Sequence, residues 1–265
     1  MVIHFWIGVF HLKDKVVIVT GGSSGMGKAM ASRFAKEQAK VVITGRDLER
    51  LELAKKEIET YDGQVLTVQM DVRNIEHVEH MKTETLKAFG RIDFLVNNAA
   101  GNFLCRAEEL SPNGWNAVIN IVLNGTFYCT QAVGKYWIEN KIPGVVINMV
   151  ATYAWGAGAG VVHSAAAKAG VLSLTRTLAV EWGGQYGIRL NAIAPGPIER
   201  TGGADKLWVD EKAAQRTINS VPLKRLGTPE EIAGLATYMF SDEAAYMNGE
   251  CVTLDGGAWL NSHPF

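Results

Sequence analysis

The feature that most restricts the fold of this 265-residue chain is a glycine-rich segment that follows an apolar run. The run 15–20, KVVIVT, is short and rich in β-branched residues, as is typical of a strand buried in a parallel sheet. The glycines that follow it have the spacing G-x-x-x-G-x-G and lead into a helical pattern. Such glycines let the backbone approach a pyrophosphate, and a helix N-terminus offers unpaired N–H groups to it. The alternative is a tight turn without a ligand. The residues expected to line a dinucleotide-binding turn here are Gly21, Ser23, Ser24, Gly25, Met26 and Gly27.

Further strand-like runs alternate with helical patterns along the rest of the chain. These runs lie at 40–44, 64–70, 92–96, 145–149 and 188–194, and a last strand follows near the C-terminus. Alternation of this kind favours an α/β fold, and the length fits one domain of ordinary size. We therefore expect a single doubly wound Rossmann domain over residues 1–265, with a mostly parallel seven-stranded sheet and helices on both faces.

Two segments are expected to lie outside this regular pattern. Residues 1–13 form an N-terminal extension whose apolar part, Met1–Phe10, is too short to span a bilayer. It also has no basic region of the kind that begins a signal peptide. The polar stretch 199–221 has few strand signals and is interpreted as a lid that covers the substrate.

Composition excludes several classes of protein. The chain has 26 basic and 27 acidic residues, so no overall field favours nucleic acid or an anionic membrane. The three cysteines are scattered, without metal-ligand spacing, which predicts reduced thiols, no metal site and a cytoplasmic location.

The end of the second predicted strand bears on the choice of cofactor. It continues as Gly45-Arg46-Asp47, at the position that contacts the adenosine ribose in this type of fold. A carboxylate at the strand end would repel a 2′-phosphate, whereas the planar cation of Arg46 suits one. This favours NADP(H) over NAD(H). The alternative is that Asp47 caps the next helix and that Arg46 is only solvated.

Three further segments at strand ends resemble those of the short-chain dehydrogenase/reductase family. They are Asp71-Val72, NNAAG at 97–101 and PGPI at 195–198, and the resemblance covers about residues 14–258. It implies that Asp71 borders the adenine and that the proline-glycine segment lies next to the nicotinamide. The cofactor-binding positions implied in this way are Asp71, Val72, Asn98, Ala99, Lys168, Pro195, Gly196 and Ile198.

The stretch 145–170 departs from the usual pattern of that family, which is a serine followed by Tyr-x-x-x-Lys. Lys168 is present, but Ser164 stands where the tyrosine is expected and Ala151 where the serine is expected. Tyr153 lies two residues beyond the missing serine. This arrangement is similar to that of the 2,4-dienoyl-CoA reductase branch. The sequence NNAAGNF at 97–103 also resembles that branch, which uses the last asparagine of this motif, here Asn102, in its active site.

The resemblance implies that NADPH reduces a conjugated dienoyl thioester to a 3-enoyl-CoA during β-oxidation of unsaturated fatty acids. Hydride added at the far end of the diene moves negative charge onto the thioester oxygen, so the site needs hydrogen-bond donors aimed at that oxygen. Tyr153 and Asn102 are the expected donors. Lys168 is expected to hold the nicotinamide ribose, and Ser164 to hydrogen-bond a neighbour within the same network. A homotetramer is implied as well.

Contacts with the acyl-CoA substrate are assigned to four positions. Phe103 would supply an apolar wall, and Arg73 would meet a phosphate of cofactor or substrate unless it is a plain surface arginine. Ser111 is expected both to cap a helix and to lie at the substrate site. Lys206, with Arg200 beside it in the lid, would meet phosphates of the CoA.

Two rival functions are left open. One is a carbonyl or alcohol oxidoreductase of the same fold that uses a repositioned tyrosine. The other is a catalytically silent dinucleotide-binding protein, in which Tyr153 only packs under its loop. His163 is expected to be a loop or helix-start residue and not a base.

Overall fold

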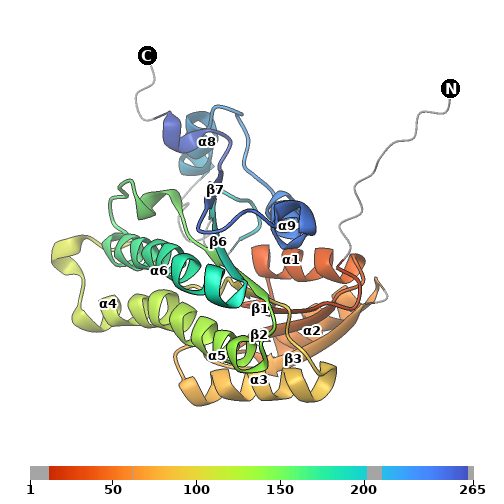
Figure 1. The fold of residues 1–265 in the computed structure, drawn as a ribbon. Helices are drawn as coiled ribbons and strands as arrows, with labels where there is room; N and C mark the ends of the chain where they lie inside the picture. Colours follow the sequence, from red (N-terminus) through yellow and green to blue (C-terminus); the bar gives the residue numbers. More distant parts are fainter. Residues whose placement is uncertain (1–11, 62, 202–210, 262–265) are drawn as a thin grey trace.

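The computed structural model describes residues 12–61, 63–201 and 211–261 (Figure 1). Its centre is one seven-stranded sheet with the order β3-β2-β1-β4-β5-β6-β7, in which every pair of neighbours is parallel. The sheet was expected to be mostly parallel, and it is entirely so. The strands are β1 (Val16–Thr20), β2 (Lys40–Gly45), β3 (Gln64–Gln69), β4 (Phe94–Asn97), β5 (Gly144–Met149), β6 (Ile188–Pro195) and β7 (Cys251–Leu254).

Helices cover both faces of the sheet, as the doubly wound pattern predicted (Figure 1). Successive side chains of β1 point to opposite faces. Val17 and Val19 therefore pack with Phe34 of α1, whereas Val16 and Ile18 pack in the core that contains Trp137 of α5. One face carries α1 (Gly25–Lys36), α2 (Leu48–Glu59) and α9 (Pro229–Phe240), and the other α3 (Ile75–Phe89), α5 (Gly125–Asn140) and α6 (Val162–Tyr186).

The helical region that follows β4 contains a feature that the sequence pattern did not show. Ser111 is followed by the expected helix, but this region is not uniform, since α4 (Pro112–Ile119) and α5 are joined by a π-helical turn, Asn120–Asn124. The side chains of Asn120 and Asn124 are hydrogen-bonded to each other at 2.8 Å. The residue after this turn, Gly125, packs so closely that a Cβ there would lie 2.6 Å from Val72. The wider turn thus brings α5 against the loop that follows β3.

The two irregular segments are only partly described. Leu12, near the end of the expected N-terminal extension, is buried in the core at 1% exposure, while residues 1–11 lie outside the described residues. The second half of the expected lid contains α8 (Glu211–Ser220), but residues 202–210, and with them Lys206, also lie outside. None of the described helices combines the length and apolar character needed to cross a membrane. The same residues contain no group of three or more His, Cys, Asp or Glu side chains placed to hold a metal ion.

Candidate active site at the carboxyl ends of the strands

The glycine-rich turn between β1 and α1 has the geometry of an anion site. Gly21 (φ +65°) and Gly25 (φ +53°) adopt the left-handed conformation that favours glycine. A Cβ on Gly27 would lie 2.2 Å from the carbonyl oxygen of Gly21, so only glycine fits there. Ser24 is the N-cap residue of α1, yet its side chain accepts no hydrogen bond from the backbone N–H groups of the first turn of this helix. The first-turn N–H groups can therefore meet a ligand, and the turn fits the pyrophosphate of a dinucleotide.

Asn98 holds this turn against the neighbouring strand. Its side-chain amide donates to the carbonyl oxygens of Thr20 and Gly21 at 3.0 and 3.1 Å. In return, the hydroxyl oxygen of Thr20 accepts from the backbone N–H groups of Asn98 and Ala99. Asn98 therefore links the carboxyl ends of β1 and β4.

At the end of β2, the exposed Arg46 precedes a capping residue. The carboxylate of Asp47 accepts from the backbone N–H of Arg50 at 3.1 Å and so begins α2. Asp47 therefore caps α2, as one of the two interpretations of the sequence predicted.

The carboxylate of Asp71 already has a cation beside it. The guanidinium of Arg73 donates to both oxygens of Asp71, and these hydrogen bonds hold the pKa of Asp71 below its usual value. The charge of Arg46 contributes a smaller lowering of the same pKa. The expected roles of Asp71 toward the adenine and of Arg73 toward a phosphate stay predictions. In either role, the residue would have to bind its ligand while it is still hydrogen-bonded to the other member of the pair.

The segment after β6 is fixed to the end of β7. A Cβ on Gly196 would lie 2.5 Å from Cβ of Asp255, and the N–H of Gly196 donates to Leu254 at 3.0 Å. Ile198 is buried and forms an isolated parallel bridge with Gly227. This close packing leaves Pro195–Ile198 at the carboxyl edge of the sheet, where open α/β folds bind their ligands.

Tyr153 is delivered to the site by the loop that follows β5. It lies, partly buried, in a short 3₁₀ turn, Thr152–Ala154, and its hydroxyl is 3.1 Å from Oγ of Ser164. Ser164 and Lys168 are one turn apart on α6 and both are buried. The displaced tyrosine therefore places its hydroxyl against the helix position where the usual family pattern has its own tyrosine.

Lys168 is a buried cation with a backbone partner. Its Nζ donates to the carbonyl oxygen of Met149, the last residue of β5, at 2.5 Å. Burial lowers the pKa of Lys168 to about 8, because the protein interior solvates an ammonium poorly. Lys168 lies one helical turn after Ser164, whose hydroxyl contacts Tyr153.

Asn102 and Phe103 lie in the loop that follows β4. The side-chain oxygen of Asn102 accepts from the backbone N–H of Phe103 at 2.9 Å, which leaves the amide NH₂ to donate elsewhere. The ring of Phe103 meets the ring of His163 edge-on, with centroids 4.5 Å apart. Because His163 precedes Ser164 on α6, contacts connect Asn102 to Tyr153.

Sequence reasoning missed two members of this arrangement. His163 begins α6, as expected, but it also contacts the expected substrate wall, and no periodicity predicts a contact between such distant parts of the chain. The carbonyl of Met149 is a backbone group, so its side chain gives no signal for it. Ser111 caps α4, as predicted, by accepting from Gly114, and its role toward substrate stays a prediction.

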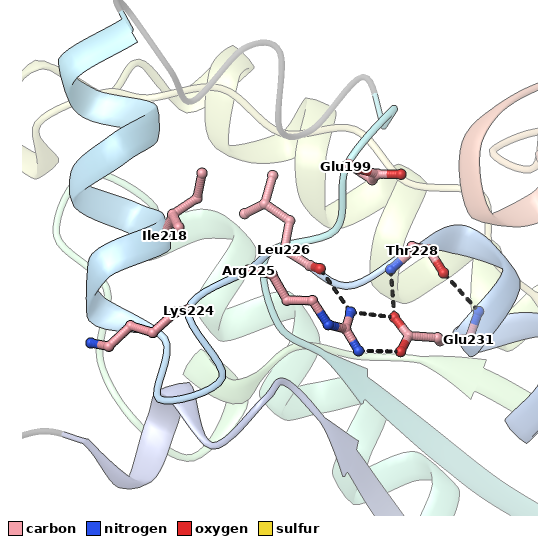
Figure 2. A pocket seen from close by; sticks show the side chains of 7 residues that line it. All are labelled: Glu199, Ile218, Lys224, Arg225, Leu226, Thr228 and Glu231. Atoms are coloured by element: carbon pink, nitrogen blue, oxygen red, sulfur yellow. Dashed lines mark hydrogen bonds and ion pairs between the residues drawn. The ribbon is translucent and has the colours of Figure 1, made fainter.

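A pocket of about 600 Å³ lies beside the expected lid (Figure 2). Its described lining includes none of the residues assigned to catalysis. Its polar side is the start of α9, where Arg225 donates to both carboxylate oxygens of Glu231 and the latter forms a capping box with Thr228. These hydrogen bonds lower the pKa of Glu231 to about 2. The cluster therefore fixes the helix end. The lining residues are Glu199, Ile218, Lys224, Arg225, Leu226, Thr228 and Glu231.

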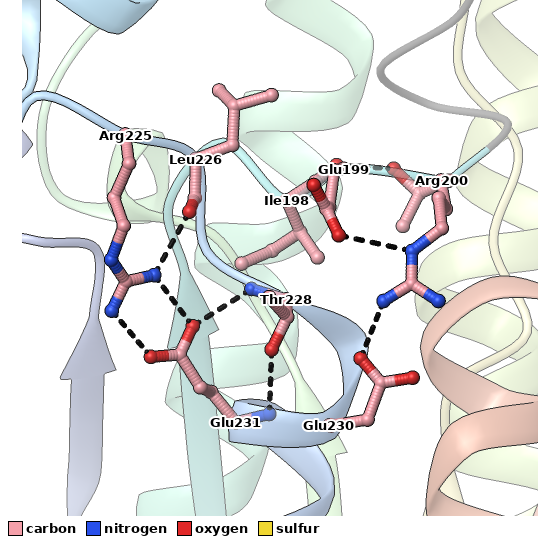
Figure 3. Close-up of polar contacts among 9 residues, drawn as sticks. Ile198, Glu199, Arg200, Arg225, Leu226, Thr228, Glu230 and Glu231 are labelled. Atoms are coloured by element: carbon pink, nitrogen blue, oxygen red, sulfur yellow. Dashed lines mark hydrogen bonds and ion pairs between the residues drawn. The ribbon is translucent and has the colours of Figure 1, made fainter.

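Arg200, expected to meet a CoA phosphate, lies next to this pocket between two carboxylates (Figure 3). Its guanidinium donates to Glu199 at 3.0 Å and to Glu230 at 2.6 Å. A phosphate would have to compete with both carboxylates for the cation.

Comparison with known proteins agrees with this geometry. The family model described as enoyl-(acyl carrier protein) reductase matches residues 21–258. The chain is 67% identical to the "Probable 2,4-dienoyl-CoA reductase [(2E)-enoyl-CoA-producing]" of Bacillus subtilis, over 96% of this chain and all of that protein. It is 42% identical to the "Probable 2,4-dienoyl-CoA reductase 3 [(3E)-enoyl-CoA-producing]" of Caenorhabditis elegans, over 95% of this chain and 82% of that one.

A solved structure supports the same assignment. The crystal structure of a short chain dehydrogenase from Bacillus anthracis superposes with a TM-score of 0.89 at 68% identity, and the match covers 96% of this chain and 100% of that one. The chain therefore belongs to the short-chain dehydrogenase/reductase family of oxidoreductases, which use a nicotinamide cofactor.

Proposed function

We propose that the protein is an NADPH-dependent 2,4-dienoyl-CoA reductase. The observation that carries the proposal is the 3.1 Å contact between the Tyr153 hydroxyl and Oγ of Ser164, one helical turn before Lys168. It supplies a phenolic donor although the usual tyrosine position is occupied by serine. The names of the relatives from B. subtilis and C. elegans support the same substrate class.

The reaction requires the chain to stabilise a negative charge on the thioester oxygen. When bound, the reduced cofactor supplies a hydride to the far end of the diene. The Tyr153 hydroxyl and the Asn102 amide would then donate to the oxygen of the resulting dienolate. One such donor contributes about 3 kcal/mol in well-studied oxyanion sites.

Lys168 and Ser164 support these donors. Ser164 holds the Tyr153 hydroxyl, and because its own hydroxyl is a weak acid, it makes a poor proton donor alone. The buried Lys168 ammonium favours negative charge on groups nearby and would hold the nicotinamide ribose.

The choice of NADPH rests on the adenosine end of the cofactor site. Arg46 follows β2, is exposed, and lies close enough to lower the pKa of Asp71 by its charge. A planar guanidinium at this position would pair with a ribose 2′-phosphate. The capping role of Asp47 removes its carboxylate from competition for the ribose.

The relatives differ in the product for which they are named. A 3-enoyl-CoA was expected, but the relative at 67% identity is named as producing a (2E)-enoyl-CoA, while the relative at 42% is named for the (3E) product. The two outcomes differ only in which carbon of the dienolate receives the proton. We propose the 2-enoyl product, in which the remaining double bond stays conjugated with the thioester.

The remaining parts of the proposal follow from the substrate class and the family resemblance. The substrate is an acyl-CoA from β-oxidation of unsaturated fatty acids, held against Phe103. The protein would act as a homotetramer in the cytoplasm.

The test is cofactor oxidation by the purified protein with a 2,4-dienoyl-CoA and, in parallel, with a panel of simple ketones. Rapid oxidation of NADPH with the dienoyl-CoA supports the proposal. Turnover of ketones alone would instead favour a carbonyl oxidoreductase. Binding of NADPH without turnover of either substrate would favour a catalytically silent protein.

A further inference from the structure

His163 is a buried histidine at the start of α6, with one nitrogen bonded and the other without a partner. Its side chain is 0% exposed, and Nδ1 accepts from the backbone N–H of Ser164 at 2.9 Å. Among the residues that the structure describes, Nε2 has no hydrogen-bond partner. Because Nδ1 is an acceptor, the proton of the neutral ring is on Nε2, where it is an unpaired donor.

The bond to Ser164 replaces a missing helix cap. The N-cap residue of α6 is Val161, whose side chain has no acceptor, and the helical ladder begins with Ala165 donating to Val161. The N–H of Ser164 therefore needs an acceptor from outside the ladder. His163 provides it, and this fixes the backbone of the residue whose hydroxyl contacts Tyr153.

On its other side, His163 supports the wall that carries Asn102. The rings of His163 and Phe103 are perpendicular, with an interplanar angle of 89° and centroids 4.5 Å apart. The backbone N–H of Phe103 in turn holds the side-chain oxygen of Asn102. One imidazole is thus linked by contacts to both proposed donors to the thioester oxygen, through Ser164 to Tyr153 and through Phe103 to Asn102.

Simple packing does not account for a histidine here. A buried donor without a partner costs about 1 to 3 kcal/mol, and an apolar ring of similar size would avoid that cost. Violations of this kind concentrate at functional sites. We infer that His163 is a positioning residue for the reduction, which keeps the Ser164–Tyr153 pair and the Phe103–Asn102 wall in one fixed arrangement. The inference rests on the proposed function.

His163→Phe is the main test, because it keeps a ring against Phe103 and removes both nitrogens. We expect a kcat at least about tenfold lower with a dienoyl-CoA and a KM for NADPH within about twofold. The melting temperature should change little, because the lost bond to the Ser164 N–H is offset by removal of the unpaired Nε2. His163→Asn keeps an acceptor for the Ser164 N–H, so it should recover part of the lost kcat. If His163→Phe does not fold, His163→Asn serves as the test, because asparagine has no ring to contact Phe103. An unchanged kcat in His163→Asn would then overturn the inference.

The matched control is Thr44→Val. Thr44 is the other buried side chain with an unpaired polar atom in the described part of the chain, and it lies in β2. Its replacement should leave kcat unchanged and not lower the melting temperature.

A double substitution distinguishes positioning from an independent effect. Since His163 acts through Tyr153, the loss caused by His163→Phe should shrink to about twofold or less in a Tyr153→Phe background. An equal loss in both backgrounds, or a folded His163→Phe with native kcat, overturns the inference. Absence of dienoyl-CoA turnover in the native protein would instead overturn the proposed function itself, so the two failures can be distinguished.

Discussion

The hydroxyl of Tyr153 and Oγ of Ser164 lie 3.1 Å apart, although one follows β5 and the other belongs to α6. A phenol thus reaches, from a loop, the position that a helix residue of the usual family pattern would occupy. Position 151, where the usual family pattern has a serine, is an alanine, whose side chain makes no hydrogen bond. The active-site chemistry is carried by a different residue on the same scaffold.

Replacing the two partners separately tests which of them serves the substrate. Tyr153→Phe removes one oxyanion donor and should lower kcat about 100-fold. Ser164→Ala removes only the group that holds the phenol, so its loss should be about tenfold or less. Steady-state kinetics with a dienoyl-CoA measures both, and a larger loss for the serine variant would refute the role given to Tyr153.

Asn102 offers a matched pair of substitutions. Asn102→Asp keeps an oxygen to accept from the Phe103 N–H but removes the NH₂ donor, whereas Asn102→Ala removes both. Both should lower kcat by about 10- to 100-fold with little change in KM, because the donor is needed most when charge develops. Near-native kcat in the aspartate variant would show that the amide donates nothing to the substrate.

Arg46 determines the cofactor preference in this account. Arg46→Ala should raise the KM for NADPH about 10- to 100-fold by removing a charged hydrogen bond to the 2′-phosphate, and should leave the KM for NADH nearly unchanged. Arg50→Ala, which removes another exposed cation from α2, is the control and should affect neither value. Equal effects of Arg46→Ala on the two cofactors would remove the argument for NADPH.

Lys168 should make stability depend on pH. Its pKa falls from 10.5 to about 8 on folding, so between these values the unfolded chain binds more protons and stability rises with pH. Below pH 8 both states are charged, and the folded state bears a burial cost of about 3 kcal/mol. Lys168→Met should therefore be inactive but more stable than the native protein at pH 7, with the difference shrinking by pH 9.

Urea unfolding of the cofactor-free protein at both pH values measures this effect. The exposed Lys135 provides a control, since Lys135→Met should shift stability equally at both pH values. A Lys168→Met variant that is less stable at pH 7 would show that the hydrogen bond to Met149 outweighs the burial cost.

The sequence was most informative where one physical requirement dominates. Buried parallel strands need continuous apolar runs, so β1 and β5 were located to within about one residue. The glycine-rich turn between β1 and α1 was also predicted correctly from the spacing of its glycines. The structure gives the physical reason for one of them, because a Cβ on Gly27 would clash with the backbone of Gly21. The strand-end residues were found through family motifs.

Features that depend on three-dimensional proximity could not be predicted in the same way. The π turn at Asn120–Asn124 lies beside the close contact of Gly125 with Val72, and its residues continue the helical pattern without a break. The pairing of Arg73 with Asp71 depends on side-chain rotamers. The contact of His163 with Phe103 joins the first turn of α6 to the loop that follows β4, and the relative placement of these two segments depends on the whole sheet.

The most direct test of the central claim is the fate of the transferred hydride. NADPH deuterated at the transferred position should be incubated with a 2,4-dienoyl-CoA, and the product analysed by NMR and mass spectrometry. Conjugate reduction predicts one deuterium at the fifth carbon of the acyl chain, a solvent proton at the fourth, and a 2-enoyl-CoA product. A 3-enoyl-CoA with the same label would correct only the site of protonation. No deuterium in any acyl product, under conditions where NADPH binds, would contradict the account.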